Sequence, residues 1–241
     1  MAPRIVSSDD RWLYKAGGIA ALALGVTFIV TILLYVYVGK LPSGGEAWLK
    51  YVAGKKTAWS VILGLSVLTD LLFVPAAFAL FAALRAVHRG VMLMATSLIG
   101  LFLVLDLAVN WTNYMSLISL SGSYSAAKSE AQRTAYAAAA NYASAILQSR
   151  LESVYSIGIL SLATLLISIA MLNGAFGKST AYVGIAAGIL GLISIGGWAA
   201  TVLLNTVLAA IWLLLIARDL YFRYAAADPA PAKHPDITVP V

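Results

Sequence analysis

Acidic and amide side chains occur inside stretches of this chain that are otherwise apolar. The segment LVLDLAVNWTNYM, residues 103–115, carries Asp106, Asn110 and Asn113 at the spacing i, i+4 and i+7. This spacing predicts that the three side chains share one face of a helix. Carboxyl groups can exchange a proton or bind an ion, and amides can join helices by hydrogen bonds. These residues are therefore the first candidates for a functional site.

A second acid and a second polar stripe extend this set. Asp70 lies in the apolar segment VLTDLLF, and Gln148, Glu152 and Tyr155 again follow the spacing i, i+4 and i+7. We expect these groups to gather in a polar pocket in the outer half of a helix bundle. The candidate pocket residues are Asp70, Asp106, Asn110, Asn113, Asn205, Tyr155, Arg150, Glu152 and Trp111.

The amino-acid composition indicates whether these polar residues are surrounded by water or by lipid. Of the 241 residues, 61% are hydrophobic and 11% are charged, and the mean hydropathy is +0.90. Soluble domains contain about 25% charged residues, so lipid must cover most of the surface. The net charge of +6 is explained by basic residues that flank membrane spans and face anionic headgroups. We therefore expect the lipid bilayer, and not nucleic acid, as the main partner.

The apolar runs predict an all-α, polytopic membrane bundle with about six transmembrane helices, because a span needs about 20 mainly apolar residues. The fourth helix is expected to extend beyond the bilayer, since the sequence before it is helix-prone but partly polar. A five-span arrangement with one long irregular helix stays open as an alternative. The predicted spans lie near residues 16–38, 58–84, 91–117, 152–172, 179–195 and 199–220, within a single bundle of residues 1–225.

The C-terminal residues 226–241 form a different kind of segment. They contain four of the chain's seven prolines, which lack a backbone donor and interrupt helices. We expect an extended tail there.

The expected topology follows from the even number of spans and from one short basic loop. The loop RAVHRG, residues 85–90, joins the second and third spans and carries two arginines. Short cytoplasmic loops are enriched in such residues. The sequence therefore predicts a multi-pass protein of the plasma membrane with both termini in the cytoplasm.

The same loop allows the depths of the two intramembrane aspartates to be compared. Asp70 and Asp106 stand at similar distances along the chain from residues 85–90, so an antiparallel hairpin places both carboxyls at nearly the same depth. The bilayer makes isolated charges costly, and two facing carboxyls can share a proton. The alternative is that Asp and Asn residues hold helices together by hydrogen bonds without a further role.

Other residues indicate packing. Gly184, Gly188 and Gly191 lie on one helix face, as expected where two membrane helices approach closely. Four tryptophans near predicted span ends are expected to be interfacial anchors; these are Trp12, Trp48, Trp59 and Trp198.

Known catalytic signatures are absent from the sequence. It contains no HExxH motif, no phosphate-binding glycine loop and no GxSxG motif. Its two histidines do not form a cluster, and the absence of cysteine excludes thiolate metal sites. We therefore expect neither an enzyme nor a metal centre, and the sequence identifies no cofactor.

Two segments carry a family resemblance. The stretches FALFAALRAVHRGVMLMATSLIG and IWLLLIARDLY resemble the bacterial and archaeal multi-span membrane proteins catalogued as domain of unknown function family 4386. The resemblance implies a helical membrane bundle of about this length. It implies no catalytic residue.

Three classes of function are consistent with these observations. The first is a non-enzymatic membrane protein that acts as an accessory subunit, with other membrane subunits as partners, or binds a lipid or small hydrophobic ligand. The second is a proton- or ion-coupled transporter that uses Asp70 and Asp106. The third is an intramembrane enzyme. We rank them in this order, because a transporter is expected to show internal repeats or broken helices and an enzyme needs a catalytic set.

Overall fold

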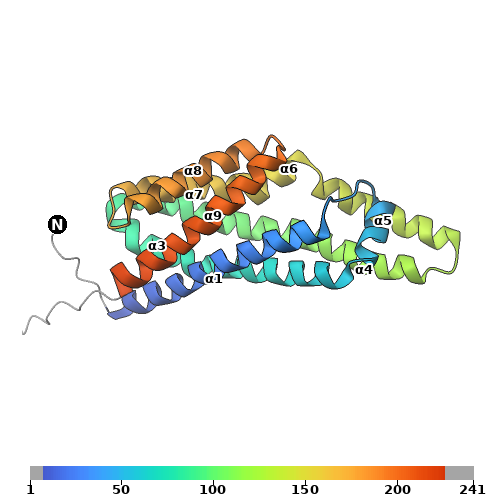
Figure 1. Cartoon of the computed structure of the whole chain (residues 1–241), viewed down its shortest axis with the longest axis horizontal. Coiled ribbons are helices and arrows are strands. Elements are labelled where there is room, and N and C mark those ends of the chain that lie inside the picture. The colour runs from blue at the N-terminus through green and yellow to red at the C-terminus, as the bar shows by residue number, and fades with distance from the viewer. Residues whose placement is uncertain (1–7, 226–241) are drawn as a thin grey trace, which may run out of the picture.

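The computed structural model describes residues 8–225, and every regular element in that range is helical (Figure 1). Four helical segments are long and apolar enough to cross a membrane. They are Arg11–Val38, Lys56–Ala126, Arg150–Leu172 and Ala200–Phe222. The predicted all-α fold with membrane-spanning helices is therefore confirmed, but the number of six spans is not. The expected extended tail, residues 226–241, lies outside the described residues.

The elements follow one another as helices joined by short connections. Their bounds are α1 Ser8–Val38, α2 Gly45–Ala53, α3 Lys56–Leu105, η1 Asp106–Trp111, α4 Thr112–Ala126, α5 Glu130–Leu147, α6 Arg150–Ser153, η2 Val154–Gly158, α7 Ile159–Leu172, α8 Lys178–Ser194, α9 Ala199–Asp219 and η3 Leu220–Ala225. The three η elements are π-helical.

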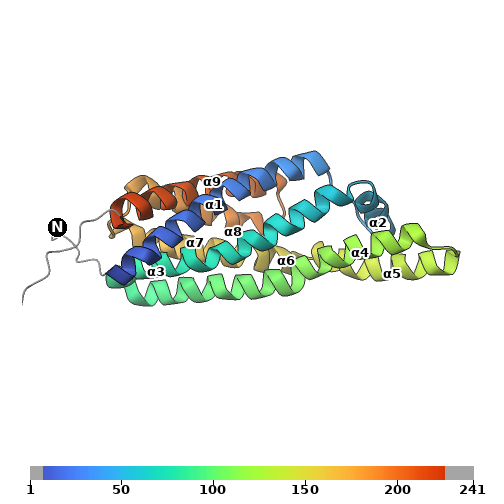
Figure 2. The same ribbon diagram turned by 90° about the horizontal axis from the view of Figure 1, so that it is seen from below.

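The predicted hairpin of the second and third spans is present as a sharp bend within α3. His88 has non-helical angles (φ −145°, ψ 78°), and the chain there turns back along itself (Figure 2). The rings of Phe73 and Phe102 then meet across the two arms at 5.9 Å. Pro75 lies within the first arm without interrupting it. The second arm continues through η1 and α4 to Ala126, beyond the predicted end of the third span.

The expectation of one extended fourth helix is wrong. α5 ends at Leu147, and Ser149, two residues later, has extended angles (φ −74°, ψ 149°). The Ser149 hydroxyl accepts a hydrogen bond from the Glu152 backbone N–H at 3.1 Å, which caps a new helix. The polar first part of the segment is therefore a separate helix, which packs against α4.

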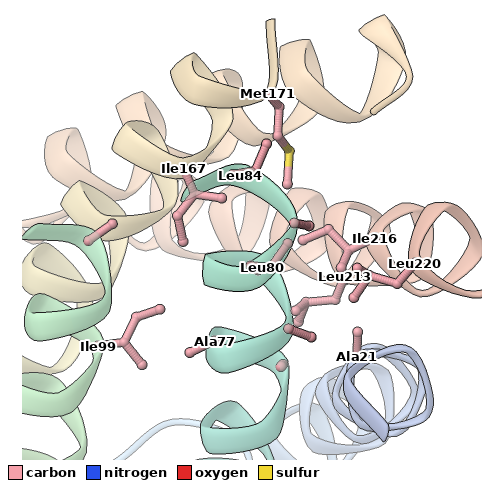
Figure 3. Close-up of a cluster of buried hydrophobic side chains, with 14 of the residues drawn as sticks. Ala21, Ala77, Leu80, Leu84, Ile99, Ile167, Met171, Leu213, Ile216 and Leu220 are labelled. Atoms are coloured by element: carbon pink, nitrogen blue, oxygen red, sulfur yellow. The ribbon is translucent and has the colours of Figure 1, made fainter. Parts of the chain in front are cut away.

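An aliphatic core fills the half of the bundle next to the His88 bend, where α1, α3, α7 and α9 meet (Figure 3). Leu80, Leu84, Ile167 and Ile216 are almost completely buried there. The glycine stripe of α8 packs as predicted. A Cβ atom on Gly184 would lie 2.0 Å from the Ser168 hydroxyl of α7 and 2.2 Å from Trp212 Nε1 of α9. The bare backbone of α8 thus allows three helices to approach closely.

Asp219 stabilises the end of the bundle next to the His88 bend by hydrogen bonds between helices. Its carboxylate accepts hydrogen bonds from the Gly177 backbone N–H at 3.0 Å and from the Thr180 hydroxyl at 2.7 Å. Arg218 donates to the other carboxylate oxygen at 2.9 Å. The side chain of Asp219 therefore caps the N-terminus of α8 from the neighbouring helix. The segment IWLLLIARDLY contains both residues of this contact.

A second core forms at the opposite end of the bundle. We call α2, α5 and residues 117–126 of α4 the headpiece; it extends beyond α1 and α9 (Figure 1). Leu49, Leu117 and Ala140 are fully buried in it. Gly45 donates its N–H to the Asn141 side-chain oxygen at 2.5 Å, which joins α2 to α5. Residues between the first two predicted spans therefore fold into a packed helix.

The headpiece also changes the interpretation of two tryptophans. Trp48 and Trp59 are each 1% exposed, so they belong to the core and are not interfacial anchors. The rings of these two residues lie 5.6 Å apart. Trp12 and Trp198 are 72% and 65% exposed, as an anchor in the membrane interface requires.

Candidate functional site

A cavity of about 710 Å³ lies between the two cores. Its volume falls in the range of about 300–1,000 Å³ that is typical of small-molecule sites. Most of its wall is apolar or aromatic, and polar residues are concentrated on α3, η1 and the helices that follow α5. The lining residues are Phe28, Thr31, Ile32, Tyr35, Val36, Ser66, Thr69, Asp70, Phe73, Phe102, Asp106, Asn110, Trp111, Tyr114, Glu152, Ser156, Ile157, Leu160, Ser161, Thr164, Ala187, Val202, Leu203, Asn205, Thr206 and Ala209.

Three carboxyl groups meet at one side of this cavity. Asp70 and Asp106 are 3% and 4% exposed, and their side chains are close enough to hydrogen-bond to each other. Trp111 Nε1 donates to Asp70 Oδ2 at 2.7 Å. Asn110 Nδ2 donates to Asp106 Oδ1, and it lies 3.3 Å from Glu152 Oε1. The hairpin therefore brings the two aspartates together, and Asn110 connects them to the helix of Glu152.

The π-helical segment η1 determines which residues face the cavity. Its i to i+5 hydrogen bonding widens the helical turn. Asp106 is consequently followed on the cavity wall by Asn110, Trp111 and Tyr114. Asn113, which a regular α-helix would place on this face, is not a lining residue. Its Nδ2 atom donates to the Val109 carbonyl at 2.7 Å, so its expected place in the pocket is wrong.

Of the remaining predicted site residues, some line the cavity and others do not. Asn205 of α9 lines the cavity. Tyr155 is buried but does not line it. Arg150 is exposed to solvent and lies outside the cavity wall. The expectation that Arg150 and Tyr155 belong to the pocket is therefore wrong.

Aromatic rings close the cavity on the side of the headpiece. Trp59 and Tyr114 are stacked with their centroids 5.3 Å apart, and Trp111 and Tyr114 are 5.7 Å apart. Tyr35 meets Trp59 edge to face at 6.2 Å. Beyond these rings lies the packed core of the headpiece. Aromatic side chains thus cover the end of the cavity that lies farthest from the His88 bend.

The exposed lining residues lie between α1 and α9. Val36 is 72% exposed and Leu203 is 53% exposed, whereas the other described lining residues are buried or half-buried. Nearer the His88 bend, Gly25 packs closely against Ala210 and Leu214 of α9. The two helices diverge from that contact toward the headpiece (Figure 1). The cavity therefore opens sideways, where apolar side chains would face lipid.

Several polar lining residues were not in the predicted set. Thr69, Ser156, Ser161 and Thr164 all line the cavity. Three of them follow Glu152 along η2 and α7 at roughly helical spacing. Continuing that stripe from Glu152 toward Leu172 would have found them in the sequence.

No group of three or more His, Asp or Glu side chains among residues 8–225 could hold a metal ion. In comparisons with known proteins, the chain matches no family model, no curated protein and no solved structure. The resemblance to the family of unknown function therefore stays an expectation.

Proposed function

We propose that this protein is a non-enzymatic protein of the plasma membrane that binds a lipid or another small hydrophobic ligand inside the bilayer. The observation that carries the proposal is the cavity of about 710 Å³, which is walled by apolar side chains and bordered by exposed residues of α1 and α9. As an accessory subunit, the protein would present this ligand to other membrane subunits.

The position of the opening supports a ligand that arrives from lipid. The outer surfaces of α1 and α9 beside it are apolar; their exposed residues include Leu33, Val36, Leu203, Leu204 and Val207. Aromatic rings and the headpiece cover the end of the cavity. A hydrophobic molecule can therefore reach the polar groups without crossing water.

A cavity-filling variant tests this function. Ala209 lines the cavity on α9, so Ala209→Phe should place a bulky ring where the ligand binds. We expect the lipophilic molecules that copurify with the protein to fall about tenfold, which corresponds to about 1.4 kcal/mol of binding free energy. Mass spectrometry of the purified protein would measure the loss.

Val207→Phe is the matched control, because Val207 lies two residues away, is exposed and is not a lining residue. It should leave the bound molecules unchanged. Equal amounts in the wild type and in Ala209→Phe would refute the proposed function.

We further propose six passes, with both termini and the His88 bend in the cytoplasm. The bend divides the 71-residue segment Lys56–Ala126 into two arms, and α8, although only 17 residues long, adds a further pass. The start of α1 packs beside the end of α9, since a Cβ on Gly18 would lie 3.5 Å from Leu220 Cβ. Arg85 and Arg89 flank the bend, as the positive-inside rule favours for a cytoplasmic turn.

Cysteine labelling in intact cells tests this orientation. The chain has no cysteine, and both Ser43 and Gly90 are exposed. An impermeant maleimide should label Ser43→Cys and should not label Gly90→Cys until the cells are opened. Ser43 is preferable to Gly44, whose φ of +85° disfavours a side chain. The reverse labelling pattern would invert the topology.

The second candidate function is a proton- or ion-coupled transporter that uses Asp70 and Asp106. It is favoured by the two π-helical segments, η1 and η2, which interrupt the helices on two walls of the cavity beside the carboxyls. π-Helical segments occur frequently at functional sites, and transporters bind substrates at interrupted helices. In proteoliposomes with a pH gradient, a transporter would show coupled uptake that Asp106→Asn abolishes, whereas a non-transporting protein would show no coupled uptake in either form.

A further inference from the structure

The charged groups that line the cavity are all acidic. Asp70, Asp106 and Glu152 supply carboxyl oxygens, but no Lys, Arg or His among residues 8–225 lines the cavity. The side-chain nitrogens of Trp111 and Asn110 already donate to these carboxyls. Asn110 is 3% exposed, and its Oδ1 atom has no hydrogen-bond partner within the described part of the chain. Hydroxyl groups and the Asn205 amide add neutral donors to the wall, but none of the described lining residues carries a positive charge to complement the three carboxyls.

An ammonium group would complement these acceptors. Buried carboxylates need a cationic or hydrogen-bonding partner, and an ammonium carries three N–H donors and no acceptor. It could donate to the carboxylates and to Asn110 Oδ1 together. The faces of aromatic rings also attract cations, and Tyr35, Trp111 and Tyr114 all line the cavity.

We propose that the ligand of this cavity is an amine with an apolar body. Its ammonium group binds between Asp106, Glu152 and Asn110, and its apolar body lies along the cavity wall toward the opening between α1 and α9. This inference rests on the proposed function and specifies the chemical class of its ligand. A divalent metal ion is a poorer occupant, because the described carboxyls do not form a metal-binding group.

Matched probes that differ in their head groups test the inference. The protein is placed in nanodiscs of zwitterionic lipid, and binding of dodecylamine, dodecanol and dodecanoate is measured by calorimetry at neutral pH. Empty nanodiscs correct for partition into lipid. We expect the amine to bind about tenfold more tightly than the alcohol, as a charge-assisted hydrogen bond allows. Dodecanoate should bind most weakly, because the carboxyl-rich wall repels it.

Glu152→Gln removes one carboxyl while it keeps the shape of the side chain. It should reduce the preference for amine over alcohol by about tenfold, because the amine loses a charge-assisted hydrogen bond and the alcohol only a weaker one. Glu130→Gln is the control, since Glu130 is exposed in the headpiece and should not alter the preference. The melting temperature of each variant shows that the fold is retained. If Glu152→Gln unfolds, the wild-type ranking of the three probes decides the question.

The outcomes separate this inference from the function on which it rests. Equal binding of amine and alcohol, with both lost in Ala209→Phe, would overturn the amine and keep the hydrophobic ligand. A preference that survives in Glu152→Gln would also overturn the amine site. If Ala209→Phe binds all three probes as tightly as the wild type does, the ligand-binding function itself would be refuted.

Discussion

Replacement of Gly184 by alanine is expected to destabilise the bundle by about 2–3 kcal/mol, the upper part of the usual range for overpacking. The added methyl group would lie 2.0 Å from Ser168 Oγ and 2.2 Å from Trp212 Nε1. Ser168 is fully buried and Trp212 is 4% exposed, so neither side chain has free space into which it can move. α8 would have to separate from α7 and α9.

Gly100→Ala is the control for this experiment. Gly100 also lies within a helix, but a Cβ added there meets no atom within 4 Å. Alanine is the better helix former, so this variant should be neutral or stabilised by less than about 1 kcal/mol. Unfolding in sodium dodecyl sulfate, followed by circular dichroism, would measure both. If the two alanine variants were equally stable, the close approach of α8 to its neighbours would be incorrect.

Asp106→Leu is expected to cost on the order of 1–3 kcal/mol of folding stability, the usual cost of leaving a buried polar group without its partner. Leucine removes the acceptor of the hydrogen bond from Asn110 and the neighbour of the Asp70 carboxyl. Asp70 would keep its hydrogen bond from Trp111, which limits the loss. The same sodium dodecyl sulfate titration would measure the change.

Asp106→Asn separates hydrogen bonding from charge. The amide oxygen can still accept from Asn110, and the amide nitrogen can donate to Asp70. We therefore expect a stability close to that of the wild type. Equal destabilisation by Asn and Leu would show that the carboxyl chemistry of Asp106, and not its hydrogen bonds, holds η1 in place.

The sequence predicted the pairing of Asp70 and Asp106 because that pairing depends on local properties. Helical rise is constant, and the basic segment around His88 marks the turn, so counting residues from the turn gives the depth of each acid. Asn113 was placed wrongly by the same reasoning. The count assumed 3.6 residues per turn, and the π-helix of residues 106–111 changes the direction of every side chain after it.

The headpiece shows a second feature that local sequence patterns could not predict. Trp48 and Trp59 stand near the ends of apolar runs, and a local pattern cannot distinguish an interfacial anchor from a core residue. Their burial depends on contacts with α4 and α5, whose residues lie far along the chain. The break at Ser149 that separates α5 from α6 has a weak signal in the sequence, since serine before a polar turn also occurs within continuous helices.

The sequence by itself determined that this is an all-helical membrane protein and that buried acids stand on two neighbouring helices. Composition and helical periodicity suffice for both, because lipid requires apolar side chains and internally satisfied backbone groups. The sequence also placed Glu152 and Asn205 near those acids, and both line the cavity. The tertiary structure alone decided that Arg150 stays outside and that the cavity opens between α1 and α9. These features depend on how helices diverge and pack across long sequence separations, and no local pattern encodes that geometry.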